Sequence, residues 1–191
     1  NYPLRGHKAL IWDGGTRVAG FISSPLLPAA VRGTKNHGLF HVTDWLPTIV
    51  GLAGGTTKRN FALDGHDIMP SIVAGGASPR TEMLYGINPL PDGQAGPPKA
   101  GLRIGGMKVL CWNYHIAGIG GANQTGPVHT GAPPEFGDAC ALYDLDADVG
   151  ERNNIAKSNP EQLNKLLARL KVLADESVQP QMWTKPYQGP D

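Results

Sequence analysis

The chain has 191 residues, which is enough for one well-packed core, or for one core with a small satellite. Its 17 basic and 16 acidic residues give a formal net charge of +1, so charge gives no basis for binding nucleic acid or an acidic membrane surface. The 26 glycines and 17 prolines indicate many turns and long loops, and no apolar run reaches the roughly 18 residues of a membrane-spanning helix.

The opening segment, residues 1–17, combines cationic side chains with a Gly-Gly pair. Its cations are Arg5, Lys8 and Arg17. The short apolar run at residues 9–12 predicts a strand, and Lys8 lies immediately before its first residue. Gly14–Gly15 allows the backbone to approach another group closely. A lysine held at such a place suits a phosphate or sulfate group, and the alternative is a surface lysine beside an ordinary turn.

Two further apolar runs precede the first predicted helix. Val18–Ser24 is short, rich in β-formers and bounded by Ser-Pro, which predicts a strand in a sheet that is covered on both faces. Leu39–Thr43 is a third run of this kind, and we expect it to be a strand that leads directly into a helix.

The helix predicted after Thr43 has clear start and stop signals. Thr43 or Asp44 fits the N-cap, and Gly54–Gly55 fits the end. The apolar residues at 45, 46, 49, 52 and 53 form one face, which predicts a core helix. His41 and Asp44 lie three residues apart at its start, where capping is favoured over a metal pair.

The character of the chain changes near residues 75–78, where we place a domain boundary. A strand-like run follows at residues 81–85, and residues 102–112 read as a hairpin with Gly-Gly at its turn. Residues 141–145 predict another strand. The segment at residues 113–139 has too few apolar residues to fold alone. A loop of that length normally needs a covalent cross-link between its ends.

The two cysteines, Cys111 and Cys140, flank this loop and allow only one pairing. Two unrelated buried thiols are the alternative, which a cytosolic protein would favour. The loop also contains Asn123-Gln124-Thr125, an acceptor sequence for N-glycosylation. A disulfide and a glycan would both indicate an oxidising compartment, and the residues alone leave the two interpretations open.

The last predicted elements are an acidic turn and a leucine-rich helix. Calcium binding and a purely structural turn are both open for the four acids, which are Asp144, Asp146, Asp148 and Glu151. Asn159 fits the N-cap of the helix, and Pro160 and Gln162 complete a capping-box arrangement. Leucines at 163, 166, 167, 170 and 173 recur at helical spacing, so this stripe should dock the helix against a sheet.

Several stretches of the sequence resemble sulfatases. Pro3-Leu4-Arg5-Gly6-x-Lys8, followed by Trp12-Asp13-Gly14-Gly15-x-Arg17, resembles the segment after the late metal-binding Asp-Asn pair of that family. The nearest likeness is to the arylsulfatase B group, the N-acetylgalactosamine-4-sulfatases, with their I and J relatives. The other matching stretches are His41-x-x-Asp44-Trp45-x-Pro47-Thr48, Leu63-Asp64-Gly65-x-Asp67 and Leu142-Tyr143-Asp144-Leu145.

The resemblance implies roles for single residues. The family's lysine at the position of Lys8 contacts the substrate sulfate, and we expect Arg5 and Arg17 to support the loop that carries it. The family usually has Glu where Asp13 stands, so the carboxylate is kept on a shorter side chain. The family binds no metal at the acidic turn, which favours the structural interpretation there.

The resemblance also implies the architecture. The predicted fold class is α/β, with residues 1–76 forming the end of the large mixed sheet of the sulfatase, alkaline phosphatase-like fold. Residues 77–191 would form a small antiparallel sheet packed by the C-terminal helix. Because the chain opens in mid-motif, we expect it to be a piece whose front half is missing.

The implied function is hydrolysis of sulfate esters, of the aryl sulfate or N-acetylgalactosamine sulfate type. The family uses Ca²⁺ and a cysteine converted to formylglycine, but the Cys-x-Pro-Ser-Arg and Asp-Asp motifs are absent here. Both groups are therefore expected on a missing N-terminal sulfatase polypeptide, and this chain alone is expected to be inactive. The family is found in lysosomes or outside cells. Together with a Cys111–Cys140 disulfide and a glycan on Asn123 this implies an oxidising compartment, so we expect a lysosomal or secreted, extracellular location. The alternative is a non-catalytic, sulfatase-derived module that binds sulfated glycans or has a structural role.

Overall fold

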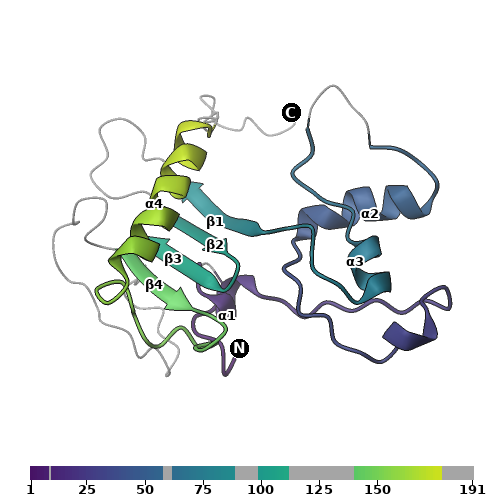
Figure 1. Cartoon of the computed structure of the whole chain (residues 1–191), viewed down its shortest axis with the longest axis horizontal. Helices are drawn as coiled ribbons and strands as arrows, with labels where there is room; N and C mark the ends of the chain where they lie inside the picture. The colour runs from purple at the N-terminus through teal and green to yellow at the C-terminus, as the bar shows by residue number, and fades with distance from the viewer. Residues whose placement is uncertain (9, 58–61, 89–98, 112–139, 178–191) are drawn as a thin grey trace, which may run out of the picture.

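A computed structural model describes the whole chain except residue 9 and residues 58–61, 89–98, 112–139 and 178–191 (Figure 1). Its described part consists of a four-stranded sheet with a long helix on one face, and of a lobe of short helices and extended segments beside the sheet. No helix among the described residues is long and apolar enough to cross a membrane.

The sheet is antiparallel, with the strands side by side in chain order. They are β1 (Glu82–Asn88), β2 (Lys99–Ile104), β3 (Met107–Cys111) and β4 (Cys140–Asp144). Ile104 pairs with Met107 across the turn at Gly105, whose φ is +58°, which confirms the predicted hairpin. The strands predicted at residues 81–85 and 141–145 are also confirmed.

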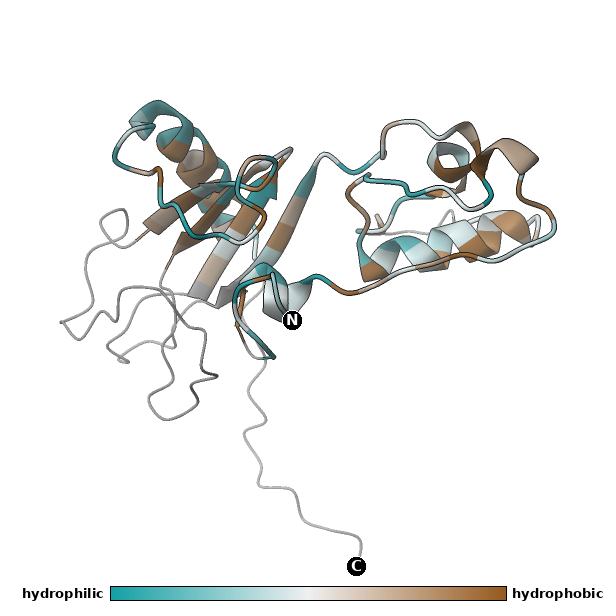
Figure 2. Cartoon of the chain, turned by 90° about the horizontal axis from the view of Figure 1, so that it is seen from below, coloured by the Kyte–Doolittle hydropathy of each residue, from teal (hydrophilic) through white to brown (hydrophobic). Residues whose placement is uncertain are grey.

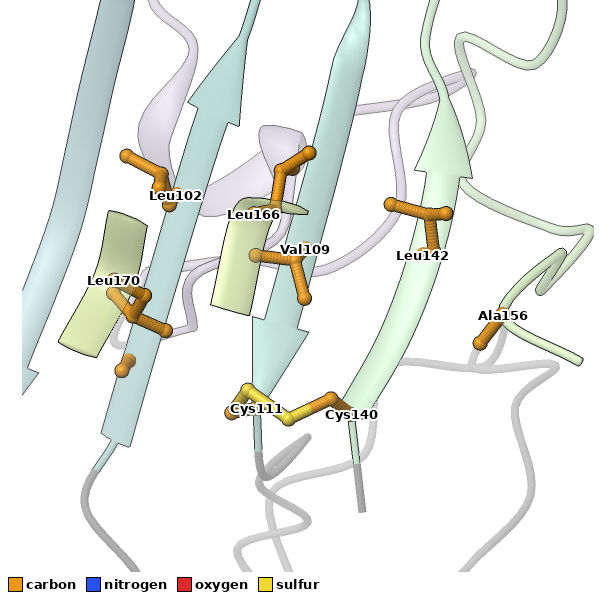
Figure 3. Packing of buried hydrophobic residues seen from close by; sticks show 9 residues of the cluster. Leu102, Val109, Cys111, Cys140, Leu142, Ala156, Leu166 and Leu170 are labelled. Carbon is orange, nitrogen blue, oxygen red and sulfur yellow. A yellow bond between two sulfur atoms is a disulfide. The ribbon is translucent and has the colours of Figure 1, made fainter. Parts of the chain in front are cut away.

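Helix α4 (Pro160–Asp175) covers one face of this sheet. Its Leu166 and Leu170 are fully buried among side chains from β2, β3 and β4, namely Leu102, Val109 and Leu142 (Figure 3). The leucine stripe is therefore core, as predicted. The capping box is wrong, because the Asn159 side chain makes no cap and its amide instead donates to the Ile155 carbonyl. An exposed Asn close to the preceding turn reaches that carbonyl more readily.

The disulfide predicted between Cys111 and Cys140 is present. The two residues are register partners at the end of the β3–β4 ladder, and their Cα atoms are 4.1 Å apart. Both are buried in the core cluster beneath α4 (Figure 3). The bond thus closes the base of the long loop, whose own residues lie outside the described part.

The opposite face of the sheet is covered by the opening segment of the chain. Leu10 and Trp12 are buried there against Leu110, Ala141, Tyr143 and Leu145. Side chains alternate along β3, so Leu110 points to this face while Val109 points to α4. The predicted strand at residues 9–12 is wrong: Leu10–Trp12 is irregular and leads into the short helix α1 (Asp13–Thr16). These apolar residues pack on the face of a sheet instead of pairing with its edge.

The lobe, residues 18–80, has little core of its own. It contains η1 (Ala29–Val31), η2 (Val42–Asp44), α2 (Trp45–Leu52) and α3 (Met69–Ala74). The strands predicted at Val18–Ser24 and Leu39–Thr43 are wrong, because both segments are irregular and the second runs into η2. No strand lies among the described residues of the lobe, so an extended segment there has no ladder partner.

Helix α2 lies where the sequence predicts a helix, but its apolar face does not lie in a core. Leu46, Ile49 and Leu52 are all more than half exposed, while Pro47 and Thr48 on the opposite face are buried. The sequence pattern correctly predicts an apolar stripe, and the described residues provide nothing that covers it.

The start of α2 is fixed by Asp44, which is fully buried. Its carboxylate accepts hydrogen bonds from the backbone N–H of His41 (2.7 Å) and of His66 (2.9 Å) and from Arg80 Nε (3.0 Å). Burial raises the pKa of Asp44, but the bonds from Arg80, His66 and His41 outweigh it, so the pKa lies below its ordinary value. The predicted capping role of His41 and Asp44 is confirmed for η2, whereas Asp44 stands at the N-cap position of α2 without a side-chain cap there.

Candidate functional site

Lys8 lies on a tight loop, residues 4–8 and 10, that folds back on α1. We call this the Lys8 loop. The Gly14 N–H donates to the Arg5 carbonyl (2.7 Å), and the Leu10 N–H donates to the His7 carbonyl (3.0 Å). A Cβ on Gly14 would overlap the carbonyl oxygen of Arg5, and one on Gly15 would overlap that of His7. The predicted close approach at the Gly-Gly pair is therefore confirmed, and the group approached is the backbone of the Lys8 loop.

The Lys8 side chain itself is exposed. Its backbone carbonyl lies 2.8 Å from the Nδ1 of His7, which helps to hold the residue in place. Within the described part of the chain, its ammonium group has no hydrogen-bond or ion-pair partner. The Lys8 ammonium can therefore bind an anion without first breaking an ion pair with a described residue. Because hydrogen bonds hold the backbone of the Lys8 loop, binding an anion also requires little rearrangement of that backbone.

Arg5 and Arg17 differ in how they hold the opening segment. The Arg5 guanidinium stacks on the Trp12 ring at 3.7 Å from the centroid, and its Nη1 donates to the Glu151 carbonyl (2.7 Å). Arg17 lies 3.8 Å from a carboxylate oxygen of Asp13, and its side chain is half exposed, so this pair is weak. Arg5 thus connects the Lys8 loop to the turn after β4.

Beneath α1 lies a buried ionic cluster formed by Asp13, Lys108 and Glu151. Lys108 Nζ is 2.7 Å from Asp13 Oδ1 and 2.7 Å from Glu151 Oε1, and none of the three side chains is more than 2% exposed. The other carboxylate oxygen of Glu151, Oε2, accepts the backbone N–H of Asp13 (2.7 Å). The Lys108–Glu151 contact is an ion pair without hydrogen-bond alignment, because Oε1 has no hydrogen-bond partner within the described residues.

Burial shifts the pKa values of ionisable groups in this cluster and next to it. Burial raises the pKa of the Glu151 carboxyl, although the nearby Lys108 ammonium acts in the opposite direction. The Tyr85 ring lies 4.2 Å from Lys108 Nζ, and burial raises the pKa of the Tyr85 hydroxyl. Glu151 has a φ of +52°, a left-handed conformation that residues other than glycine rarely adopt.

Lys108 is not among the candidate residues of the sequence analysis, and Glu151 is named there only as one of the four acids of the turn after the last predicted strand. The signal that could have found Lys108 is its place in β3, between neighbours that are apolar on both faces of the strand. A sheet that is covered on both faces buries every side chain of a central strand, so a lysine there needs an acidic partner. The acidic turn supplies this partner through Glu151, while Asp148 accepts the backbone N–H groups of Arg152 and Asn153.

The described residues do not provide the cofactor sites of a sulfatase. Among them, no group of three or more His, Cys, Asp or Glu side chains could hold a metal ion. Both cysteines are in the disulfide, so neither presents a thiol for conversion to formylglycine. Asn123, the predicted glycosylation site, lies outside the described residues.

The sequence is similar to known sulfatases over most of its length. It is 33% identical to mouse arylsulfatase J over 188 residues, covering 89% of this chain and 31% of the relative. It is 30% identical to human arylsulfatase A over 183 residues, covering 92% and 34%, and 26% identical to human steryl-sulfatase, covering 94% and 31%. No family model matches the chain.

The fold is similar to that of a solved structure as well. The crystal structure of Ps i-CgsB superposes with a TM-score of 0.65 and 20% identity, covering 95% of this chain and 34% of that protein. The chain thus spans about a third of the length of the relatives that it matches. It is homologous to a segment of the sulfatases, and its described fold agrees with the predicted α/β class.

Proposed function

We propose that the chain is the C-terminal segment of a sulfatase of the arylsulfatase B, I and J type, and that Lys8 contacts the sulfate group of the substrate. The substrate would be an aryl sulfate or an N-acetylgalactosamine sulfate. One observation carries the proposal: a chain homologous to sulfatases presents, on a tightly held loop, an exposed lysine whose ammonium group has no partner among the residues that the structure describes.

The chemistry of Lys8 follows from its charge. As the ester bond breaks, negative charge grows on the sulfate oxygen that leaves with the substrate's hydroxyl group. An ammonium group in contact with that oxygen stabilises the transition state more than the bound ester. Arg5 and Arg17 would act on the shape of the Lys8 loop and on stability. In the complete enzyme, formylglycine would supply the nucleophile and Ca²⁺ would polarise the sulfate, both held by residues outside this chain.

The lobe supports the proposal that a further sulfatase polypeptide packs against this chain. Among the described residues of the lobe the buried apolar side chains are Leu27, Pro47 and Ile68 alone. The exposed large apolar residues are Val18, Phe21, Leu26, Val42, Trp45, Leu46, Ile49, Leu52 and Val73, and Figure 2 shows hydrophobic stretches along α2. A surface of this kind marks a protein interface, and relatives three times as long contain polypeptide that could cover it.

Two further expectations belong to the same proposal. The isolated chain should have no sulfatase activity, because positioned cations cannot replace a missing covalent nucleophile. The complete protein should be lysosomal or secreted, a location supported by the buried disulfide, since such bonds persist in oxidising compartments.

The experiment is Lys8→Ala in the complete enzyme, assayed with an aryl sulfate. We expect the turnover number to fall by about 10²–10³, or roughly 3–4 kcal/mol, with the melting temperature nearly unchanged. Arg17→Ala is the matched control: it removes a cation from the same segment, and its effect on turnover should be less than about threefold, as for a weak surface pair. Near-normal turnover of Lys8→Ala would show that the role is assigned to the wrong residue.

A further inference from the structure

The cluster beneath α1 connects the Lys8 loop to the sheet through an unbroken series of contacts. Lys108 projects from β3, and Asp13, which pairs with it, is the first residue of α1. The N–H of the next residue, Gly14, donates to the Arg5 carbonyl, and the backbone of the Lys8 loop packs directly against Gly14. The position of α1 on the sheet therefore sets the position of the backbone that carries Lys8.

Glu151 makes two of the contacts that hold α1 and the loop. Its Oε2 accepts the backbone N–H of Asp13, and its own carbonyl accepts Arg5 Nη1. Its φ of +52° would be free of strain with glycine, so the left-handed turn alone gives no reason for a glutamate. The reason lies in the side chain, which turns inward to meet Asp13 and Lys108 and is fully buried.

We propose that Glu151 and Lys108 are positioning residues, which act on substrate through Lys8 by fixing α1 and the Lys8 loop to the sheet. The effect of these two residues on catalysis rests on the proposed function, in which Lys8 binds the substrate sulfate. Their effect on the position of the Lys8 loop does not depend on that function. Neither residue touches substrate: both are fully buried beneath α1. A lysine whose backbone is held in place loses less freedom when it binds a sulfate oxygen than one on a loose loop.

The first test is amide hydrogen exchange on the full chain with Glu151→Ala. This variant removes the acceptor of the Asp13 N–H but leaves Lys108 paired with Asp13, so no buried charge is left alone. We expect exchange at Leu10, Asp13 and Gly14 to accelerate about 10- to 100-fold, the range for a lost hydrogen bond to a charged group, with α4 amides changing less than about threefold. Glu151→Gln keeps an acceptor oxygen and should restore most of the protection.

The matched control for this test is Asp148→Ala. Asp148 lies in the same turn, and its side chain accepts the N–H groups of Arg152 and Asn153 and not that of a reporter residue, so the three reporter amides should be unaffected. The bond from the Glu151 N–H goes to the backbone carbonyl of Asp148, which the substitution keeps. The proposal is overturned if Glu151→Ala leaves those amides unchanged, or if α4 exchanges faster by the same factor, which would indicate a general loss of stability. If Glu151→Ala does not fold, Glu151→Gln becomes the test variant, with a several-fold acceleration expected at the same amides and none in α4.

The second test is a double-mutant cycle on turnover in the complete enzyme. Glu151→Ala should lower the turnover number about tenfold when Lys8 is present, but less than about twofold in the Lys8→Ala background, because its effect passes through Lys8. The same loss in both backgrounds would overturn the positioning role. If Lys8→Ala alone leaves turnover unchanged, the proposed function fails, and the exchange experiment still decides whether Glu151 fixes the loop.

Discussion

Lys108→Met is the substitution with the largest expected effect on stability. The ammonium is fully buried and has a carboxylate oxygen at 2.7 Å on each of two sides. Its removal leaves the Asp13 and Glu151 carboxylates with no buried cation between them, since only the weak, half-exposed pair of Asp13 with Arg17 remains. Breaking a buried pair from one side costs about 3–5 kcal/mol. That is a large part of the roughly 5–15 kcal/mol that holds a typical domain folded.

The assay is urea unfolding of the full chain, followed by tryptophan fluorescence. With a slope of about 2 kcal/mol per molar urea, the midpoint should fall by about 2 M. Lys171→Met is the matched control, because the pair between Lys171 and Asp175 is more than half exposed on both sides and should contribute less than about 0.5 kcal/mol.

A charge-free version of the cluster separates ionic from packing effects. Lys108→Met combined with Asp13→Asn and Glu151→Gln keeps the side-chain volumes nearly constant and leaves no unpaired charge in the buried cluster, so at least half of the lost stability should return. A loss below about 1 kcal/mol for Lys108→Met alone would refute the reasoning, because the ammonium would then not be compensating the two carboxylates.

Three further predictions concern other parts of the chain. Cys111→Ser with Cys140→Ser opens a loop of sequence separation 29 and should cost about 3–4 kcal/mol in urea unfolding, whereas a loss below about 1 kcal/mol contradicts it. Asp44, whose pKa is lowered in the folded state, stabilises the fold above its ordinary pKa of about 3.9 and loses this contribution as the pH falls through the lower folded value. The stability difference between the wild type and Asp44→Asn should therefore shrink as the pH is lowered from 6 to below about 3, and a constant difference rules this out. Ile49→Asp should weaken association with the proposed sulfatase polypeptide by about 10- to 100-fold in a binding titration, while Val149→Asp, at another exposed apolar residue, should not, and equal effects would exclude α2 as the interface.

The sequence predicts most accurately the elements whose partners lie within the chain. The hairpin at Gly105, the leucine stripe on α4 and the Cys111–Cys140 bond are all local or adjacent in the sheet, so pattern and turn chemistry are enough. The division of the chain at residue 76 stays a prediction.

The errors fall where an apolar segment has more than one possible neighbour. Residues 10–12 and 18–24 have strand-like composition, but composition does not say whether such a segment pairs with an edge, packs on a face or stays exposed. Leu46 and Ile49 show the same limit in a helix, since their spacing predicts an apolar face but not what covers it.

The candidate site divides in the same way. The sequence suggests Lys8 and the Gly-Gly pair because their signals are local. It gives no direct sign that Lys108 and Glu151 meet Asp13, because these contacts join residues 95 and 138 positions apart. Contacts of such separation depend on the whole topology, which the spacing of residue types does not encode.

The most direct test of the account is intact-mass and peptide analysis of the native protein, isolated without denaturant and assayed with an aryl sulfate. The account predicts that the 191 residues are recovered together with further sulfatase polypeptide that carries formylglycine, either in one longer chain or as a bound partner, and that this preparation hydrolyses the ester. Recovery of the 191-residue chain as the sole polypeptide, without formylglycine, or turnover of the ester by that chain alone, would contradict it.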